Sequence, residues 1–178
     1  MTDSVHFSSQ DHTWETPHDL FALLDHEFNF VLDVCAVPTT AKCRRYFTPH
    51  DDGLAQSWSG VCWMNPPYGR EIVRWVAKAH RTAASGQGSV ICLVPARTDT
   101  RWWWDHARFA EVRFLPGRLK FGGAANSAPF PSAILVFRSG LPPARTLYWN
   151  WRALAAGHQL SLESLAPMGK AGGVGGGA

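Results

Sequence analysis

Short apolar runs that each stop at a polar or proline-containing segment are the feature that most limits how this chain can fold. The clearest are residues 30–34, 61–64 and 89–95, which consist mainly of Val, Ile, Leu, Cys, Phe and Trp. Runs of this kind are typical of strands that are buried on both faces. Residues 17–28 and 70–84 carry apolar side chains at helical spacing. Strands that alternate with helices in this order predict an α/β protein with a mainly parallel sheet flanked by helices.

Later segments extend the pattern less regularly. Strands are expected at about 111–115 and 132–138, with a polar, glycine-containing loop between them. A helix is expected over residues 99–109. After a Pro-Pro break, residues 144–156 are expected to form a terminal helix.

The length of 178 residues allows one domain with its own hydrophobic core. We place this domain at residues 1–140, with a polar, flexible segment at 1–13. Residues 141–166 are expected to be a helical extension, and the glycine-rich residues 167–178 a disordered tail. A monomer or a weak dimer is expected.

Arginine dominates the basic residues, supplying 13 of 17 in a chain whose net charge is +3. Because arginine forms forked contacts with phosphate and with guanine, this balance suits a nucleic-acid partner.

The four cysteines form no CxxC pair, so reduced thiols and no metal site are expected. No apolar run approaches the roughly 20 residues that span a bilayer, and no leader pattern is present, so we expect a cytoplasmic protein without a membrane contact.

The strongest chemical signal is Asn65-Pro66-Pro67-Tyr68, which directly follows a predicted buried strand. Ligands bind where the strands of an open α/β sheet end, so Asn65 is expected at a site. An amino group on a purine is a poor nucleophile, because its lone pair is delocalised. Asn65 Oδ1 and the Pro66 carbonyl could accept its two hydrogens and favour a pyramidal nitrogen. Pro67 keeps Pro66 extended, and Tyr68 can stack on a base extruded from a duplex. The loop therefore predicts methyl transfer by positioning, with a plain strand-to-helix turn as the alternative.

Acidic and hydroxyl residues near the same predicted edge are candidates for holding a methyl donor. Asp33 can accept hydrogen bonds from the ammonium group of a methionine moiety, or it can cap the next turn. Thr16 and Pro17 either contact the same moiety or serve as the N-cap and first residue of the helix. Asp52 either accepts from the adenine amino group of the donor or acts as a turn residue.

Basic residues lie beside aromatic ones in two later loops. Arg97 and Arg101 precede three consecutive tryptophans, and Arg118 and Lys120 precede the last predicted strand of the core. This combination suits a DNA backbone and an unstacked base, with a solvated basic edge as the alternative. We take these four residues as candidate DNA-binding residues.

Six segments in order also match a known pattern over roughly residues 10–138. They are Trp14-Glu15-Thr16-Pro17 with Leu20-Phe21, Leu32-Asp33-Val34-Cys35-Ala36, Tyr46-Phe47-Thr48 with Asp52-Gly53-Leu54 and Trp58, Trp63-Met64-Asn65-Pro66-Pro67-Tyr68, Leu93-Val94-Pro95-Ala96-Arg97-Thr98 and Gly117-Arg118-Leu119-Lys120-Phe121. Together they resemble the phage and prophage DNA N6-adenine methyltransferase family, often called Dam-type.

The resemblance implies a class I, Rossmann-like methyltransferase that uses S-adenosylmethionine to methylate N6 of adenine in double-stranded DNA. Such enzymes are commonly encoded by phages or prophages of bacterial hosts. The resemblance implies Asn65, Pro66, Pro67 and Tyr68 as the catalytic loop. It further implies a donor site made of Thr16, Pro17, Asp33, Ala36 and Asp52.

Two departures from this fold class stand out. The segment 34–38 lacks the usual glycine-rich loop, and Asn65 follows Asp33 by only 32 positions. The sheet is therefore expected to be abbreviated, without the usual acidic partner for a ribose. The chain has no room for a large target-recognition domain, so loops such as 97–108 and 117–131 are expected to read the DNA.

Other functions fit some of the same residues. A protein glutamine N5-methyltransferase can use an Asn-Pro-Pro-Tyr loop, because a side-chain amide also presents two hydrogens. N4 of cytosine is another possible target, although serine is more usual at the first loop position. A non-catalytic DNA-binding module would explain the basic residues but not an intact loop.

Overall fold

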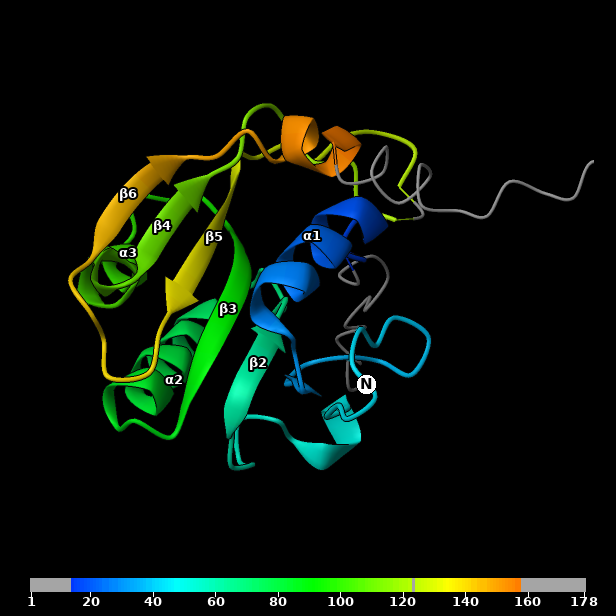
Figure 1. Ribbon diagram of the computed structural model, residues 1–178. Helices are drawn as coiled ribbons and strands as arrows, with labels where there is room; N and C mark the ends of the chain where they lie inside the picture. Colours follow the sequence, from blue (N-terminus) through cyan, green and yellow to red (C-terminus); the bar gives the residue numbers. More distant parts are fainter. Residues whose placement is uncertain (1–13, 123, 158–178) are drawn as a thin grey trace, which may run out of the picture.

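In the part of the chain that the structure describes, six strands form an open sheet with helices on both faces (Figure 1). The computed structural model describes residues 14–122 and 124–157. The strands lie in the order β1-β2-β3-β5-β4-β6. They are β1 (Leu32–Asp33), β2 (Gly60–Met64), β3 (Gly88–Pro95), β4 (Glu111–Phe114), β5 (Ser132–Phe137) and β6 (Arg145–Tyr148).

The sheet is mixed, so the expectation of a mainly parallel sheet is only partly correct. β1, β2 and β3 pair in parallel, and so do β4 and β6. β5 lies between β3 and β4 and is antiparallel to both. An antiparallel neighbour needs only a loop, whereas a parallel one needs a crossover, and residues 115–131 form such a loop. Because β3 and β4 are both antiparallel to β5, β4 runs in the same direction as β1, β2 and β3. These four strands therefore end at the same edge of the sheet.

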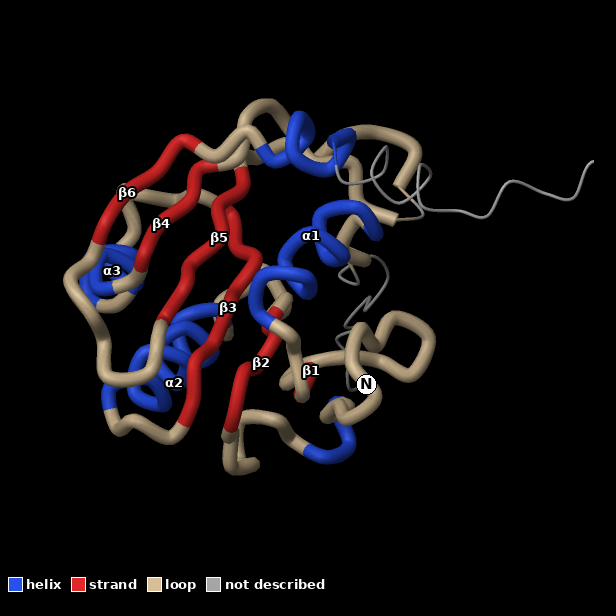
Figure 2. Tube along the Cα trace, viewed as in Figure 1, coloured by secondary structure: helices blue, strands red, loops and turns tan. Residues whose placement is uncertain are grey.

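Helices cover both faces, as predicted. α1 (His18–Phe28) lies over one face, and α2 (Ile72–Ala84) and α3 (Arg101–Asp105) lie over the other (Figure 2). The segment expected as one helix over 99–109 is α3 followed by the 3-10 helix η2 (Ala107–Phe109).

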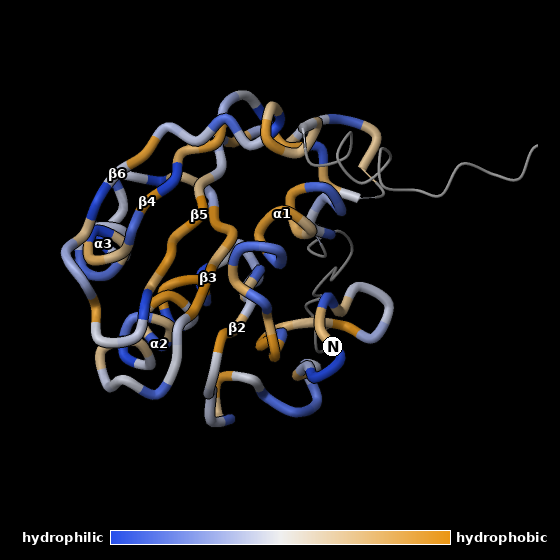
Figure 3. The backbone as a smooth tube through the Cα atoms, in the orientation of Figure 1, coloured by the Kyte–Doolittle hydropathy of each residue, from blue (hydrophilic) through white to orange (hydrophobic). Residues whose placement is uncertain are grey.

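The core lies between these layers, and the central strands are hydrophobic along most of their length (Figure 3). Every residue of β5 is buried, and so are seven of the eight in β3. α2 adds Ile72, Val76, Ala79 and Ala83, which recur at helical spacing and are all under 5% exposed. Val73 points outward and is 41% exposed. This packing fixes where β2 ends and α2 begins, and therefore the path of the loop between them.

The outer side of β1 is paired by a loop segment. Asp33 forms a parallel bridge with Tyr46, its N–H donates to the Arg45 carbonyl, and the Phe47 N–H donates to the Asp33 carbonyl, both at 2.9 Å. Between β1 and β2, the described regular structure is the 3-10 helix η1 (Pro49–Asp51). The short spacing between Asp33 and Asn65 is thus spanned without a further strand.

The first helix begins at His18, so the expected N-cap at Thr16 is wrong. Pro17 occupies the cap position in an extended conformation, with no side-chain cap. The Thr16 hydroxyl is instead bonded to Asn65, where Oγ1 accepts from Nδ2 at 3.1 Å.

The expected helix over 144–156 is correct only in its second part. Residues 145–148 form β6, and residues 151–157 are helical. β6 pairs with the edge of β4, whose backbone groups would otherwise lack strand partners. The division of the chain at residue 140 stays a prediction. The flexible segment expected at 1–13 and the tail expected at 167–178 lie outside the described residues.

Candidate active site

A cavity of about 550 Å³ lies at the carboxyl ends of β1 and β2. Its walls come from residues 14–16 before α1, 33–42 after β1, 48–54 around η1, and 63–75 between β2 and α2. Small-molecule sites in proteins have volumes of roughly 300–1,000 Å³, so this cavity can hold a ligand of nucleoside size. The location agrees with the general rule for open α/β sheets.

Asn65 lines this cavity, and three hydrogen bonds fix its amide. Nδ2 donates to the Trp14 carbonyl at 2.5 Å and to Thr16 Oγ1 at 3.1 Å, while Oδ1 accepts from the Tyr68 hydroxyl at 2.8 Å. A backbone carbonyl only accepts hydrogen bonds, so Nδ2 must face Trp14. The amide orientation is therefore determined, and Oδ1 keeps a second lone pair for a ligand N–H.

The rest of the loop is divided between the cavity and the core. Pro67 is exposed and lines the cavity, whereas Pro66 is buried and does not line it. Tyr68 is also buried, and its hydroxyl donates to the Leu93 carbonyl at 3.3 Å as well as to Asn65. Its ring meets Phe121 and Phe130 edge-on. In this structure the Tyr68 hydroxyl holds the Asn65 amide, and the Tyr68 ring is packed against Phe121 and Phe130 rather than exposed to a ligand.

Asp33 is a buried carboxylate in the cavity wall. It is 3% exposed, and its oxygens accept from the backbone N–H groups of Cys35 at 3.3 Å and Lys42 at 3.1 Å. Burial raises the pKa of Asp33 to about 6, although these hydrogen bonds and the Lys42 charge act in the opposite direction. A cationic ligand group would stabilise the ionised form.

The other predicted donor-site residues are brought together in part. Thr16, Ala36 and Asp52 line the same cavity as Asp33, and Pro17 does not. Asp52 is held at φ 49° at the end of η1, which agrees with the turn predicted there. The next residue must be glycine, because a Cβ at Gly53 would lie 2.2 Å from the Val34 carbonyl oxygen. This close approach joins the walls formed by residues 33–42 and 48–54.

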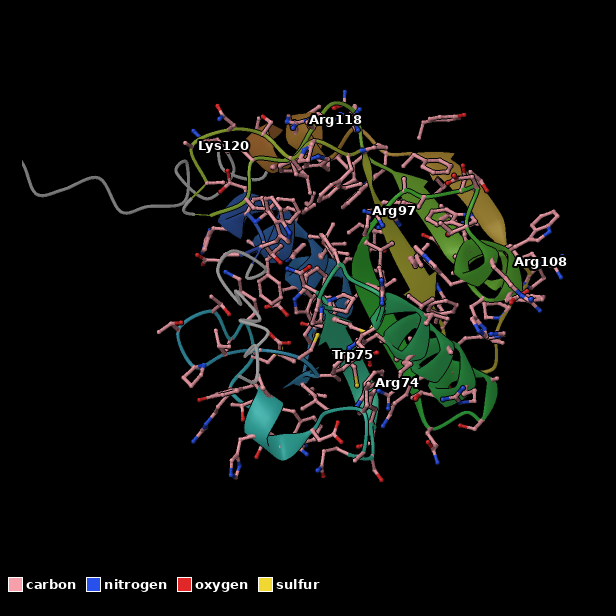
Figure 4. The ribbon with its side chains drawn as sticks, turned by 180° about the vertical axis from the view of Figure 1, so that it is seen from behind. Arg74, Trp75, Arg97, Arg108, Arg118 and Lys120 are labelled. Atoms are coloured by element: carbon pink, nitrogen blue, oxygen red, sulfur yellow. The ribbon has the colours of Figure 1, made fainter. Side chains whose placement is uncertain are left out.

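All four predicted DNA-binding residues are exposed. Arg97 follows β3, and Arg118 and Lys120 follow β4, so these three lie beyond the carboxyl edge of the sheet (Figure 4). Arg101 begins α3 and pairs with Asp105 at 3.2 Å. Arg152 donates to the Pro116 and Arg118 carbonyls, and so attaches the helix at 151–157 to the loop that carries Arg118.

Sequence reasoning missed Lys42 and Trp75 in the cavity wall. Lys42 lies in a loop without periodicity, and only the folded chain brings its ammonium 3.0 Å from Glu15 Oε1. Trp75 stacks on Trp58 with ring centroids 6.0 Å apart, and it lines the cavity together with Arg74. Its apolar spacing in α2 predicts a core position, and that signal alone does not distinguish a core ring from a cavity wall.

The four cysteines are free thiols. Burial raises the pKa of Cys62 to about 11 and that of Cys43 to about 12, so both stay protonated near neutral pH.

Within residues 14–122 and 124–157, no three His, Cys, Asp or Glu side chains gather as metal ligands. In the same part of the chain, no helix has the length and apolar character needed to cross a membrane.

An open α/β sheet with a nucleoside-sized cavity at its carboxyl edge defines a class of proteins that bind small ligands there, and it is compatible with the methyltransferase fold. The chain belongs to the family described as DNA N-6-adenine-methyltransferase (Dam), whose profile matches residues 3–149. The resemblance found in the sequence is thereby confirmed.

Two curated relatives match shorter stretches. The "DNA N-6-adenine-methyltransferase" of Haemophilus phage HP1 (strain HP1c1) is 32% identical over 106 residues, which cover 58% of this chain and 61% of the phage protein. The "Putative methyltransferase YfdM" of Escherichia coli (strain K12) is 38% identical over 63 residues, which cover 31% of this chain and 69% of that protein. The match with the phage protein thus spans less than two thirds of that protein's length.

Proposed function

We propose that this protein is a DNA methyltransferase that transfers a methyl group from S-adenosylmethionine to N6 of adenine in double-stranded DNA. The observation that carries the proposal is the fixed amide of Asn65 in the wall of a nucleoside-sized cavity that Asp33 also lines. Family membership supports DNA adenine as the target.

The residues around the cavity fit the proposed donor. Asp33 offers a carboxylate to an ammonium group, and the Thr16 hydroxyl and Ala36 lie in the same wall. Asp52 and Trp75 offer a polar and an aromatic surface to a nucleoside. When bound, S-adenosylmethionine supplies an activated methyl group on a sulfonium.

Asn65 is proposed to act on the target amino group. Its Oδ1 accepts one N–H hydrogen, and the Pro66 carbonyl accepts the other, which localises the nitrogen lone pair. Because Pro66 does not line the cavity in this structure, this second contact requires the loop to shift when the base enters. Because Trp14, Thr16 and Tyr68 already hold the amide, little reorganisation of the Asn65 side chain is needed when the base arrives. The role of the protein is therefore positioning and electrostatic stabilisation.

Stacking of an extruded adenine on Tyr68 also requires movement. Phe121 and Phe130 cover the Tyr68 ring, and both lie in the loop between β4 and β5. A base can reach the ring only if this loop shifts. The same loop carries Arg118 and Lys120, so we infer that DNA binding and opening of the base site are linked.

Removal of the two loop charges is expected to weaken DNA binding. The Arg118→Ala/Lys120→Ala variant should lose two phosphate contacts, so the slope of log affinity against log salt should fall by about 2. Fluorescence anisotropy with a labelled duplex at several salt concentrations measures this slope. Arg81→Ala is the matched control, because Arg81 is exposed in the last turn of α2, outside the loops 97–108 and 117–131 that are expected to read the DNA. An unchanged slope in the double variant would remove this loop from the DNA interface.

Donor affinity is expected to rise with pH and to level off above about pH 6, because burial raises the pKa of Asp33 to about 6. Below that pH the carboxyl must lose a proton before it can pair with an ammonium, so affinity should fall by up to about tenfold per pH unit. Calorimetric titration with S-adenosylmethionine from about pH 5 to about pH 8 measures this profile. Asp33→Asn should bind weakly and without this pH dependence. A flat profile for the unmodified protein would contradict the role of Asp33.

The proposed activity itself is tested with tritiated S-adenosylmethionine on duplex DNA and on protein extracts. Label in DNA at N6 of adenine is the expected result. Label only in protein would favour a glutamine methyltransferase, and DNA binding without donor binding would favour a non-catalytic module. Sequencing of plasmid DNA from expressing cells then reports the methylated base and its context.

A further inference from the structure

Lys42 places a cation in the cavity wall next to the buried carboxylate of Asp33. Its backbone N–H donates to Asp33 Oδ2 at 3.1 Å, so the two residues are held together. Its side chain is 15% exposed and lines the same cavity. One short segment of chain therefore presents a negative and a positive group to the same space.

Glu15 holds the Lys42 side chain in place. Glu15 Oε1 accepts from Lys42 Nζ at 3.0 Å, and the Glu15 carbonyl accepts from the Gly122 N–H at 2.8 Å. A Cβ at position 122 would lie 2.6 Å from Glu15 Oε2, so glycine leaves the room that this carboxylate needs. The ammonium is thus oriented before any ligand binds, which lowers the entropic cost of binding.

We propose that Lys42 binds the carboxylate of the amino-acid end of S-adenosylmethionine, while Asp33 binds its ammonium group. The inference rests on the proposed function. In an amino acid these two charges are attached to the same carbon, so a site for both needs opposite charges in one part of the cavity. Asp33 and Lys42 both line the cavity, and the Lys42 charge acts on the Asp33 carboxyl. An ammonium has three N–H donors, and Lys42 can keep Glu15 while it binds a second carboxylate. Glu15 is 41% exposed, so solvent screens its charge in part and Lys42 can still attract a ligand carboxylate.

The test compares two ligands by calorimetry: S-adenosylmethionine and its decarboxylated analogue, which lacks only the carboxylate. The unmodified protein should bind S-adenosylmethionine about tenfold tighter or more, as a charged hydrogen bond allows. In Lys42→Met this preference should disappear, mainly through weaker binding of S-adenosylmethionine. Lys42→Arg should keep most of it. Arg44→Met is the matched control, because Arg44 is exposed in the same loop and does not line the cavity.

Each outcome bears on the proposal. Equal loss of affinity for both ligands in Lys42→Met, or no preference in the unmodified protein, would overturn the role of Lys42 and leave the methyltransferase proposal intact. Failure of the unmodified protein to bind either ligand would overturn both. Thermal unfolding of each variant shows whether a loss of affinity reflects a loss of fold.

Discussion

Replacement of Asn65 by alanine is expected to slow methyl transfer by about a hundred- to a thousandfold, while donor affinity changes only a few-fold. The variant removes the oxygen that would accept an N–H of the target amino group. It leaves the partners of Asp33 unchanged, because the Asn65 side chain bonds to Trp14, Thr16 and Tyr68. Of the proposed donor-site residues, Thr16 is the one that loses a hydrogen bond described above. Single-turnover assays with tritiated donor and saturating DNA measure the transfer step. Comparable turnover in this variant would disprove the mechanism.

Two further variants distinguish the effect of the Asn65 oxygen from the effect of the hydrogen bonds that orient the amide. Tyr68→Phe keeps the ring and removes the hydroxyl that bonds Asn65 and the Leu93 carbonyl, so a loss of about tenfold is expected. Asn65→Asp keeps an oxygen acceptor but turns a carboxylate toward the Trp14 carbonyl, which should cost much of the activity. Activity in Asn65→Asp equal to that of the unmodified protein would show that orientation by Trp14 is unimportant.

Replacement of Glu111 by alanine is expected to lower the free energy of unfolding by about 3–5 kcal/mol. Glu111 is 6% exposed and accepts from Arg113 and Arg145, each at 2.6 Å, with Arg138 at 3.4 Å. Removal of the Glu111 carboxylate leaves the buried guanidinium of Arg113 paired with Glu27 alone among the ion pairs described here. It also removes the ion pair of Arg145 with Glu111. Chemical denaturation measures the change.

The control for Glu111 is an exposed ion pair. Asp105→Ala breaks the pair with Arg101, whose side chain is 92% exposed, and is expected to change stability by less than about 1 kcal/mol. Burial alone would raise the pKa of Glu111, but hydrogen bonds from Arg113 and Arg145 more than offset it and hold the pKa below its ordinary value of 4.5. The contribution of Glu111 is therefore present above pH 4.5 and is lost as the pH falls through the lower folded pKa. Equal effects of Glu111→Ala and Asp105→Ala at neutral pH would contradict this account.

The sequence predicts the placement of Asn65 and Asp33 well, because both follow apolar strands and parallel neighbours end at a common edge. Lys42 and Glu15 meet across 27 positions through the folded loop, and no local pattern marks such a pair. β6 is a short edge strand, so its conformation depends on its partner β4 rather than on its own residues. Thr16 looks like a helix cap because its type suits that role, yet its hydroxyl bonds to a residue 49 positions away.

Because Trp14 and Thr16 hold the amide of Asn65, the first described residues belong to the proposed catalytic site. Trp14 is itself clamped by Phe121 and Phe130, with ring centroids 5.1 and 5.6 Å away. A truncation that removes Trp14 and Thr16 would leave all six strands in the chain but would remove two of the hydrogen bonds that hold the Asn65 amide. Affinity handles and fusion partners for engineering this protein are therefore better attached away from residues 14–16.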